Sequence, residues 1–245
     1  MEKMRLSKSK IISYDMCPKQ YYFSYVKKIR PKAVEAMVLG KRLHEKFESF
    51  YRALPDKIET ESQIKETFEL ICGISQNQKE RDNLLNFFSI NLDSFRDLEK
   101  KKLLKYFKPI AIEDKYYDEE LDFVGVIDAV FQLEDKVLIV DWKTGKYREG
   151  RESGYRFELA GYKHLWDKFN PELLATHWGI GFTGNNVFWI EPIKERSIDA
   201  MYKKMEKIRQ LIKEEKFDKK KNAPCQWCGF YEQCWEGGEN VQFTI

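Results

Sequence analysis

The sequence predicts an α/β fold in which helices flank a mixed central sheet and a helical lobe precedes that sheet. Apolar residues recur at helical spacing as far as residue 107, and three runs rich in β-branched and aromatic residues follow Pro109. Two more such runs stand between predicted helices, an alternation typical of α/β folds. Of the 245 residues, 42% are hydrophobic, enough for one large core. We expect one domain over residues 1–245, with a mainly helical part at 1–108, a sheet-bearing core at 109–193, and a C-terminal helix and cysteine tail at 194–245.

The N-terminal part is predicted to consist of helices. Residues 7–29 should form a helix that begins at Ser7 or Ser9, both good N-caps, and that Pro18 interrupts or kinks. Residues 34–52 are predicted to form a second helix, followed by a helical insert at 60–107. The apolar stripe of the second helix carries Met37, Gly40, His44, Phe47 and Tyr51.

Five runs are predicted to form strands. Three of them, at 110–117, 122–133 and 136–142, follow one another, and a turn at Glu134 and Asp135 joins the last two. The remaining two, at 175–182 and 185–193, are predicted to form a hairpin. Helices are expected at 155–168 and 194–216.

The charge of the chain is small in total but unevenly spread. The net charge is +3, yet residues 1–32 carry nine Lys and Arg against two Asp and Glu, and residues 194–221 carry eleven against six. Two basic segments therefore flank an acidic middle, which suits a polyanionic partner; the alternative is a pair of solvated helix faces. The sequence has neither an apolar run long enough to cross a membrane nor a signal-peptide pattern, so we expect a cytoplasmic protein with no membrane partner.

The stretch VLIVDWKTGK carries the clearest chemical signal. Asp141 and Lys143 lie two residues apart in a predicted strand, so their side chains should share one face. Asp128 ends the preceding apolar run, and the two aspartates can converge on one cation if the strands are neighbours. Two carboxylates beside a lysine suit phosphodiester hydrolysis, in which a divalent metal lowers the pKa of its bound water. The alternative is that these are ordinary polar residues at a strand end.

Three further residues have both a functional and a structural interpretation. His44 lies on an apolar stripe, where a histidine is either a satisfied core residue or a metal ligand. Glu158 and Tyr162 are four residues apart on one helix face, either as a surface pair or in contact with the lysine, a water molecule or a DNA phosphate.

Three of the five cysteines gather near the C-terminus, at Cys225, Cys228 and Cys234. An odd number of cysteines in a chain of this kind favours metal binding or catalysis over disulfides. Three thiols are one short of the usual four-ligand site. Cys72, beside Ile71 in the helical insert, is predicted to be a small buried hydrophobic residue.

Several stretches in order resemble the RecB-like branch of the PD-(D/E)XK nucleases, and more narrowly its four-cysteine iron–sulfur kind, the group of the CRISPR-associated RecB-like exonuclease and the AddB nuclease module. They are SKSKIISYDMCPKQYYFSYV, GKRLHEKF, GVIDAVF, IVDWKTGK and ELAGY, and the resemblance covers residues 6 to 236. It implies a restriction-endonuclease-like sheet.

The resemblance also implies roles for individual residues. His44, Asp128, Asp141 and the backbone carbonyl of Trp142 match ligands of Mg²⁺ or Mn²⁺, and Lys143 matches the catalytic lysine. Tyr162 matches the tyrosine of a Q-x-x-x-Y motif whose glutamine position is Glu158 here, a departure that adds negative charge. Glu113 matches an acidic residue that is frequent in the family.

The fourth cysteine of the family corresponds to Cys17. With Cys225, Cys228 and Cys234 it fits the spacing of a four-iron four-sulfur cluster that joins the N-terminal helix to the C-terminal tail. Cys17 precedes a proline, as a ligand cysteine does in bacterial ferredoxins. Zinc is the alternative, although zinc sites more often use two C-x-x-C pairs and only one is present.

These features predict a metal-dependent DNA exonuclease that acts on single-stranded ends and carries a structural cluster. The aromatic residues Tyr21, Tyr22, Phe23 and Tyr25 either stack on bases or belong to the core. The first alternative is a non-catalytic DNA-binding or adaptor subunit. The second is a nuclease subunit of a CRISPR spacer-acquisition or recombination complex, which would work with CRISPR integrase proteins or a helicase. No G-x-x-x-x-G-K-[ST] motif occurs, so any motor would be another chain.

Overall fold

The computed structural model describes residues 5–31, 35–220 and 225–235. Its central sheet has the strand order β1 (Leu6–Ser7), β3 (Phe123–Leu133), β4 (Lys136–Lys143), β5 (His177–Phe182) and β6 (Val187–Pro192), and β2 (Ala111–Asp118) also pairs with β3. The β1–β3 and β4–β5 pairs are parallel and the others are antiparallel. The predicted α/β fold with a mixed sheet is therefore confirmed, and it is consistent with a restriction-endonuclease-like fold.

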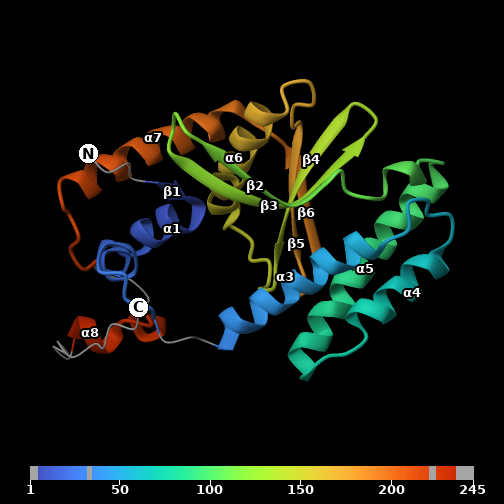
Figure 1. The fold of residues 1–245 in the computed structure, drawn as a ribbon, viewed down its shortest axis with the longest axis horizontal. Helices are drawn as coiled ribbons and strands as arrows, with labels where there is room; N and C mark the ends of the chain where they lie inside the picture. The colour runs from blue at the N-terminus through green and yellow to red at the C-terminus, as the bar shows by residue number, and fades with distance from the viewer. Residues whose placement is uncertain (1–4, 32–34, 221–224, 236–245) are drawn as a thin grey trace.

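Helices cover the sheet with two separate hydrophobic cores (Figure 1). One core joins the sheet to α1 (Lys8–Met16), α6 (Glu152–Phe169) and α7 (Glu195–Lys213). The other joins it to α3 (Glu35–Ala53), α4 (Glu61–Cys72) and α5 (Gln78–Lys100). β2, β3 and β4 contribute side chains to both cores, so these strands pack between helices from distant parts of the sequence. No helix in the described ranges has the length and apolar character needed to span a membrane.

The predicted break in the first helical segment is confirmed. The Ser7 side chain accepts a hydrogen bond from the Lys10 backbone N–H and so caps α1, while α2 (Pro18–Tyr21) begins with its proline. Proline is tolerated at the first helical position because its missing N–H has no intrahelical partner there. Cys17, in an extended conformation, separates the two helices, and a π-helical turn at Tyr22–Val26 ends the segment before the predicted residue 29.

The helical insert predicted at 60–107 is confirmed, and one detail of the second helix is wrong. The insert is two helices followed by a 3-10 turn at Leu104–Tyr106, because the Asn77 side chain caps a new helix by accepting from the Glu80 N–H. In α3, Phe47 and Tyr51 are buried as expected, but Met37 is 62% exposed. The start of α3 extends beyond the strands (Figure 1), so residues 35–38 are exposed and the helix is buried only from Leu39 onward.

The basic N-terminal segment packs against α7 and the chain that follows it. The Tyr14 hydroxyl donates to the carbonyl of Lys216 at 2.5 Å, and the Tyr21 ring stacks on Phe217 at 6.2 Å between centroids. Tyr21 is buried, so its core interpretation is confirmed. Tyr22 packs on Phe217 in the same cluster. Aromatic packing therefore joins the two basic segments into one lobe.

Candidate active site

Two aspartates on neighbouring strands face each other. The antiparallel register of β3 and β4 pairs Ala129 with Val140, which places Asp128 opposite Asp141 one step further along. Opposed residues of neighbouring strands have their side chains on the same face. The Asp128 carboxylate also accepts a hydrogen bond from the Trp142 backbone N–H at 2.7 Å. The structure thus brings the two aspartates together, as the sequence predicts.

A third carboxylate, Glu113, comes from β2 on the other side of β3. Its φ of 50° lies in the left-handed region, which a residue with a side chain rarely adopts. The regular pairing of β2 with β3 is broken at this residue, because the register passes from Ile112 directly to Asp114. Such local strain persists where the surrounding structure enforces it, often at a functional site.

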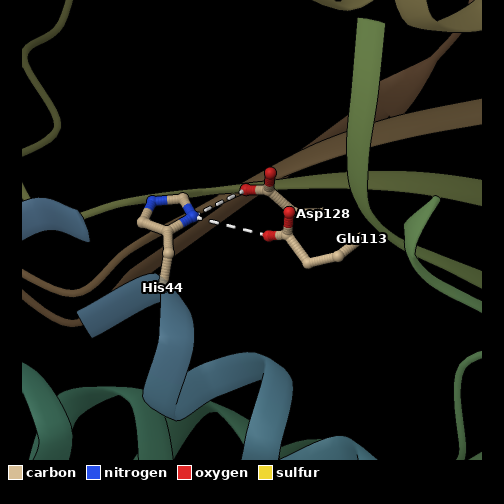
Figure 2. A group of neighbouring side chains, drawn as sticks. All are labelled: His44, Glu113 and Asp128. Carbon is tan, nitrogen blue, oxygen red and sulfur yellow. Dashed lines mark ion pairs between the residues drawn. The ribbon is translucent and has the colours of Figure 1, made fainter. Parts of the chain in front are cut away.

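His44 of α3 completes a compact group with these side chains (Figure 2). Its Nδ1 lies 3.5 Å from Oδ2 of Asp128 and 3.9 Å from Oε1 of Glu113. The ligand atoms of the three residues all lie within 4.8 Å of one another. Burial lowers the pKa of His44, but Glu113, Asp128 and Asp141 raise it by more, so it stands above its ordinary value. One imidazole and two carboxylates suit a divalent cation such as Mn²⁺ or Mg²⁺.

Asp141 belongs to a ring of four ion-paired side chains next to this group. Its Oδ1 lies 2.6 Å from Nζ of Lys8, and its Oδ2 lies 2.9 Å from Nζ of Lys143. Glu158 of α6 closes the ring, at 2.6 Å from the Lys143 ammonium and 3.8 Å from the Lys8 ammonium. The sequence left two interpretations of Glu158 open, a surface pair with Tyr162 or a contact within the site. The structure shows the second, a contact with Lys143. A metal-ligand role for Asp141 remains a prediction, because lysines hold both of its oxygens here.

The two aspartates have opposite pKa shifts. Burial, and then the charge of Asp141, raise the pKa of Asp128 to about 7. Burial also disfavours the charged form of Asp141, but Lys143 and Lys8 outweigh it and hold the pKa of that carboxyl well below its usual range. Near neutral pH the pair therefore keeps one firmly ionised carboxylate and one that readily takes up a proton.

The Trp142 side chain points to the opposite face of β4 from Asp141 and Lys143, into the core that contains α3 and α5. Its side chain is buried against α3 and α5, and the Phe87 ring stands 4.7 Å from it. Gly181 on β5 makes room for the indole, since a Cβ there would lie 2.1 Å from the ring. The buried indole fixes the end of β4 between Asp141 and Lys143. The predicted metal-binding role of the Trp142 carbonyl stays a prediction.

Tyr162 and Lys8 form the wall of the site next to α6. Tyr162 is buried, and the Lys8 ammonium lies 4.6 Å from the centroid of its ring. Burial is the largest cause of the raised pKa of the Tyr162 hydroxyl. Lys8 is the one member of the ion-pair ring that sequence reasoning missed. The available signal was its place in the N-terminal SKSK stretch, but only β1 brings that stretch to Asp141.

Cys17, Cys225, Cys228 and Cys234 line one cavity of about 340 Å³, together with Lys19, Lys219 and Lys220. Within the described ranges, however, no three of these thiols lie within 4.8 Å of one another. The cysteines share a cavity without forming a closed ligand set, so a metal centre is not shown. Cys72 is buried elsewhere, as predicted, and burial raises the pKa of its thiol to about 12.

Comparison with known proteins places this geometry in a family. The family model of the PD-(D/E)XK nuclease superfamily matches residues 5–235. The chain belongs to this superfamily. A crystal structure of a protein named as a candidate exonuclease, from Eubacterium rectale, is similar to this PD-(D/E)XK nuclease with a TM-score of 0.52 and 13% identity, over 98% of this chain and 90% of that one. At that identity the likeness supports the fold alone. No curated protein matches the sequence.

Family and geometry agree on the class of chemistry. PD-(D/E)XK nucleases act on DNA with divalent metals, and this member has a His44, Glu113 and Asp128 group of the kind that binds such a metal. The protein is thus a nuclease, and its ion-pair ring supplies lysines beside the acidic residues.

Proposed function

We propose that this nuclease is a Mg²⁺- or Mn²⁺-dependent DNA exonuclease that acts on single-stranded ends. The observation that carries the proposal is that two sets of side chains are neighbours, because Asp128 lies opposite Asp141 on β3 and β4. His44, Glu113 and Asp128 form a set of cation ligands, and Asp141 next to them holds the ammonium group of Lys143. A divalent metal bound here would lower the pKa of its water and neutralise charge on the phosphate.

The residues of the chain divide the remaining work. Lys143 places a positive charge beside the carboxylates, where it can orient the attacking water or stabilise charge on the phosphate. Glu158 positions that ammonium through its 2.6 Å contact. The Trp142 N–H fixes the Asp128 carboxylate through its hydrogen bond, which favours one orientation of that ligand.

The proposal of a single-stranded substrate rests on a hollow with a charged lining that includes Glu158. The hollow has a volume of about 570 Å³ and lies between α1, α6, α7 and the chain after α7. Its charged lining residues are Arg151, Lys204, Lys220, Asp15 and Glu158. The Lys204 ammonium pairs with Asp15 at 2.7 Å and lies 4.4 Å from the Phe157 ring centroid. A groove that combines basic and aromatic side chains suits one DNA strand, which offers both phosphates and exposed bases.

We also propose the RecB-like subgroup and its four-iron four-sulfur cluster, held by Cys17, Cys225, Cys228 and Cys234. The spacing of these cysteines and their shared cavity support the proposal, and the lysines around the cavity can balance the negative charge of a thiolate-bound cluster. A closed zinc site with bonds of about 2.3 Å needs thiols about 3.8 Å apart, whereas no three of the described cysteines have their thiols within 4.8 Å of one another. Partners from a CRISPR or helicase assembly stay predictions.

The test is a cleavage assay on DNA labelled at one end, as single strands and as duplexes, with Mg²⁺ or Mn²⁺. We expect stepwise shortening of single strands, no cleavage in EDTA, and slower cleavage of blunt duplexes. A circular single strand without ends serves as the control, because an exonuclease leaves it intact. Equal cleavage of circles and linear strands would contradict an exonuclease, and binding without cleavage would favour the adaptor alternative.

A further inference from the structure

Lys8 reaches the acidic site through an arrangement of three strands. β3 has β2 along one side, while β1 and β4 pair with it at opposite ends. β1 pairs with Phe123 and Val124, and the pairing with β4 begins at Ala129. The chain therefore leaves β1 beside the end of β4, and Lys8 is the next residue, the first of α1 (Figure 1).

Lys8 contacts three residues of the site. Its Nζ donates to Oδ1 of Asp141 at 2.6 Å, lies 3.8 Å from Glu158, and stands 4.6 Å from the centre of the Tyr162 ring. Its side chain is 22% exposed, so solvent screens these contacts only in part. With Lys143 it supplies two positive charges to the two carboxylates of the ring.

These contacts place Lys8 in competition with a metal. Asp141 presents one oxygen to each lysine, so a cation that binds this carboxylate must displace an ammonium group or share an oxygen with it. Lys143 has a second close anionic partner, because its ammonium lies 2.6 Å from Glu158 as well as 2.9 Å from Asp141. Lys8 makes the shorter contact with Asp141, at 2.6 Å, but lies 3.8 Å from Glu158. Asp141 is therefore the main anionic partner of Lys8, and a cation that takes Asp141 frees Lys8 rather than Lys143.

We propose that Lys8 is a positioning residue that holds Asp141 while no metal is bound, gives it up to a divalent cation, and then turns its ammonium group to the DNA phosphate. This inference rests on the proposed function, because it takes Asp141 as a metal ligand. In this role Lys8 has opposite effects on metal binding and on cleavage. Lys8 weakens metal binding, since it competes for Asp141, but it assists cleavage, since its charge is released beside the substrate.

The test compares Mn²⁺ binding, measured by isothermal titration calorimetry, in the wild-type chain, Lys8→Met and Lys10→Met. Removing the ammonium group that competes with the cation for Asp141 should tighten Mn²⁺ binding by about tenfold or more in Lys8→Met. Lys10 is the matched control on the same helix, because its ammonium donates to the Arg5 carbonyl at 2.6 Å and faces Tyr25. Lys10→Met should keep the wild-type affinity within about twofold, and Lys8→Arg should stay closer to wild type than Lys8→Met because the positive charge remains.

Two further measurements separate positioning from a general structural role. At saturating Mn²⁺, Lys8→Met should cut single-stranded DNA about tenfold more slowly although it binds metal more tightly. A change that merely loosens the fold would weaken both. In an Asp141→Asn background, Lys8→Met should alter Mn²⁺ affinity by less than about threefold, because the shared carboxylate charge is gone.

Circular dichroism checks that Lys8→Met is folded. If the folded variant binds Mn²⁺ as wild type does or more weakly, the inference is wrong. Tighter binding with undiminished cleavage would overturn the phosphate contact. If Lys8→Met does not fold, Lys8→Gln, which has a polar side chain, replaces it in the same measurements of Mn²⁺ affinity and cleavage. A wild-type protein that binds Mn²⁺ but cuts no DNA would contradict the proposed function instead, while the binding comparison would still decide the role of Lys8.

Discussion

The Lys143 ammonium donates a hydrogen bond to the Glu158 carboxylate at 2.6 Å. This contact joins the end of β4 to α6, across fifteen residues of sequence. It holds the lysine at the acidic site with a charged partner in the position where the resemblance has a neutral glutamine. The departure from the family pattern is therefore part of the local charge balance.

Asp141 is expected to be essential for cleavage. Asp141→Asn removes the charge that holds Lys8 and Lys143, and it should lower kcat at least about a hundredfold, since lost electrostatic stabilisation of this kind costs about 2.7–4 kcal/mol. Asp114→Asn, which changes an exposed carboxylate on β2, is the control and should keep the wild-type rate. A single-turnover assay at saturating metal measures both. Full activity in folded Asp141→Asn would refute this site.

Glu158→Gln should move the alkaline limit of activity to lower pH. Burial lowers the pKa of Lys143, but Asp141 and Glu158 outweigh it and raise the pKa above its ordinary value. The amide cannot stabilise the ammonium as the carboxylate does, so the lysine should lose its proton at lower pH. At neutral pH we expect a rate within about threefold of wild type, because the hydrogen bond remains. The pH–rate profile is the measurement, and profiles that superimpose would show that Glu158 does not act on Lys143.

Metal binding should become tighter as the pH rises through 7. Asp128 has a pKa of about 7, and a carboxylate must be deprotonated to bind a cation. Binding at pH 6 should therefore release up to two protons per metal, one from Asp128 and one from His44, whose pKa is also raised. Calorimetry in buffers of different ionisation enthalpy detects this release, which should become smaller as the pH rises to 8. Proton release that is the same at both pH values would contradict the raised pKa.

The raised pKa of Asp128 also makes the stability of the metal-free protein, measured in EDTA, depend on pH. The folded protein binds the Asp128 proton more tightly than the unfolded chain does, so this contribution is present at low pH and is lost as the pH rises towards about 7. Asp128→Asn lacks it and should gain in Tm relative to wild type as the pH rises from about 4 to about 7, with no further gain above that pH. Each unit of pKa shift corresponds to about 1.4 kcal/mol, so the gain is measurable by thermal denaturation. A difference in Tm that is constant with pH would be the contrary result.

Protein purified without oxygen should be brown and contain about four irons per chain, the number in a four-iron cluster. Cys17→Ala should lose the colour and lower the Tm, because cluster binding also stabilises the fold. Cys72→Ala is the matched control, since that cysteine is buried away from the cavity, and it should keep the colour. Iron content and visible absorbance decide the matter. One zinc without iron would exclude the cluster, and full metal content in Cys17→Ala would exclude that ligand.

Local sequence was sufficient for the elements and for part of the site. Asp141 and Lys143 share a face because strand side chains alternate, and Asp128 joins them because consecutive apolar runs form neighbouring strands. Pro18 ended the first helix because its ring removes the backbone N–H and clashes with the preceding turn. Met37 shows the limit of this reasoning, since an apolar residue at helical spacing is buried only where the fold supplies a surface for it.

By itself, therefore, the sequence determined the helices, the strands and the aspartate–lysine pair, because periodicity and turn chemistry act over a few residues. Only the tertiary structure decided which distant groups complete the site. His44 and Glu113 meet Asp128 because α3 packs near a strained residue of β2, and Lys8 meets Asp141 because β1 takes the place beside β3 where β4 ends. Such contacts arise from strand order and helix packing, and no rule of local spacing contains them.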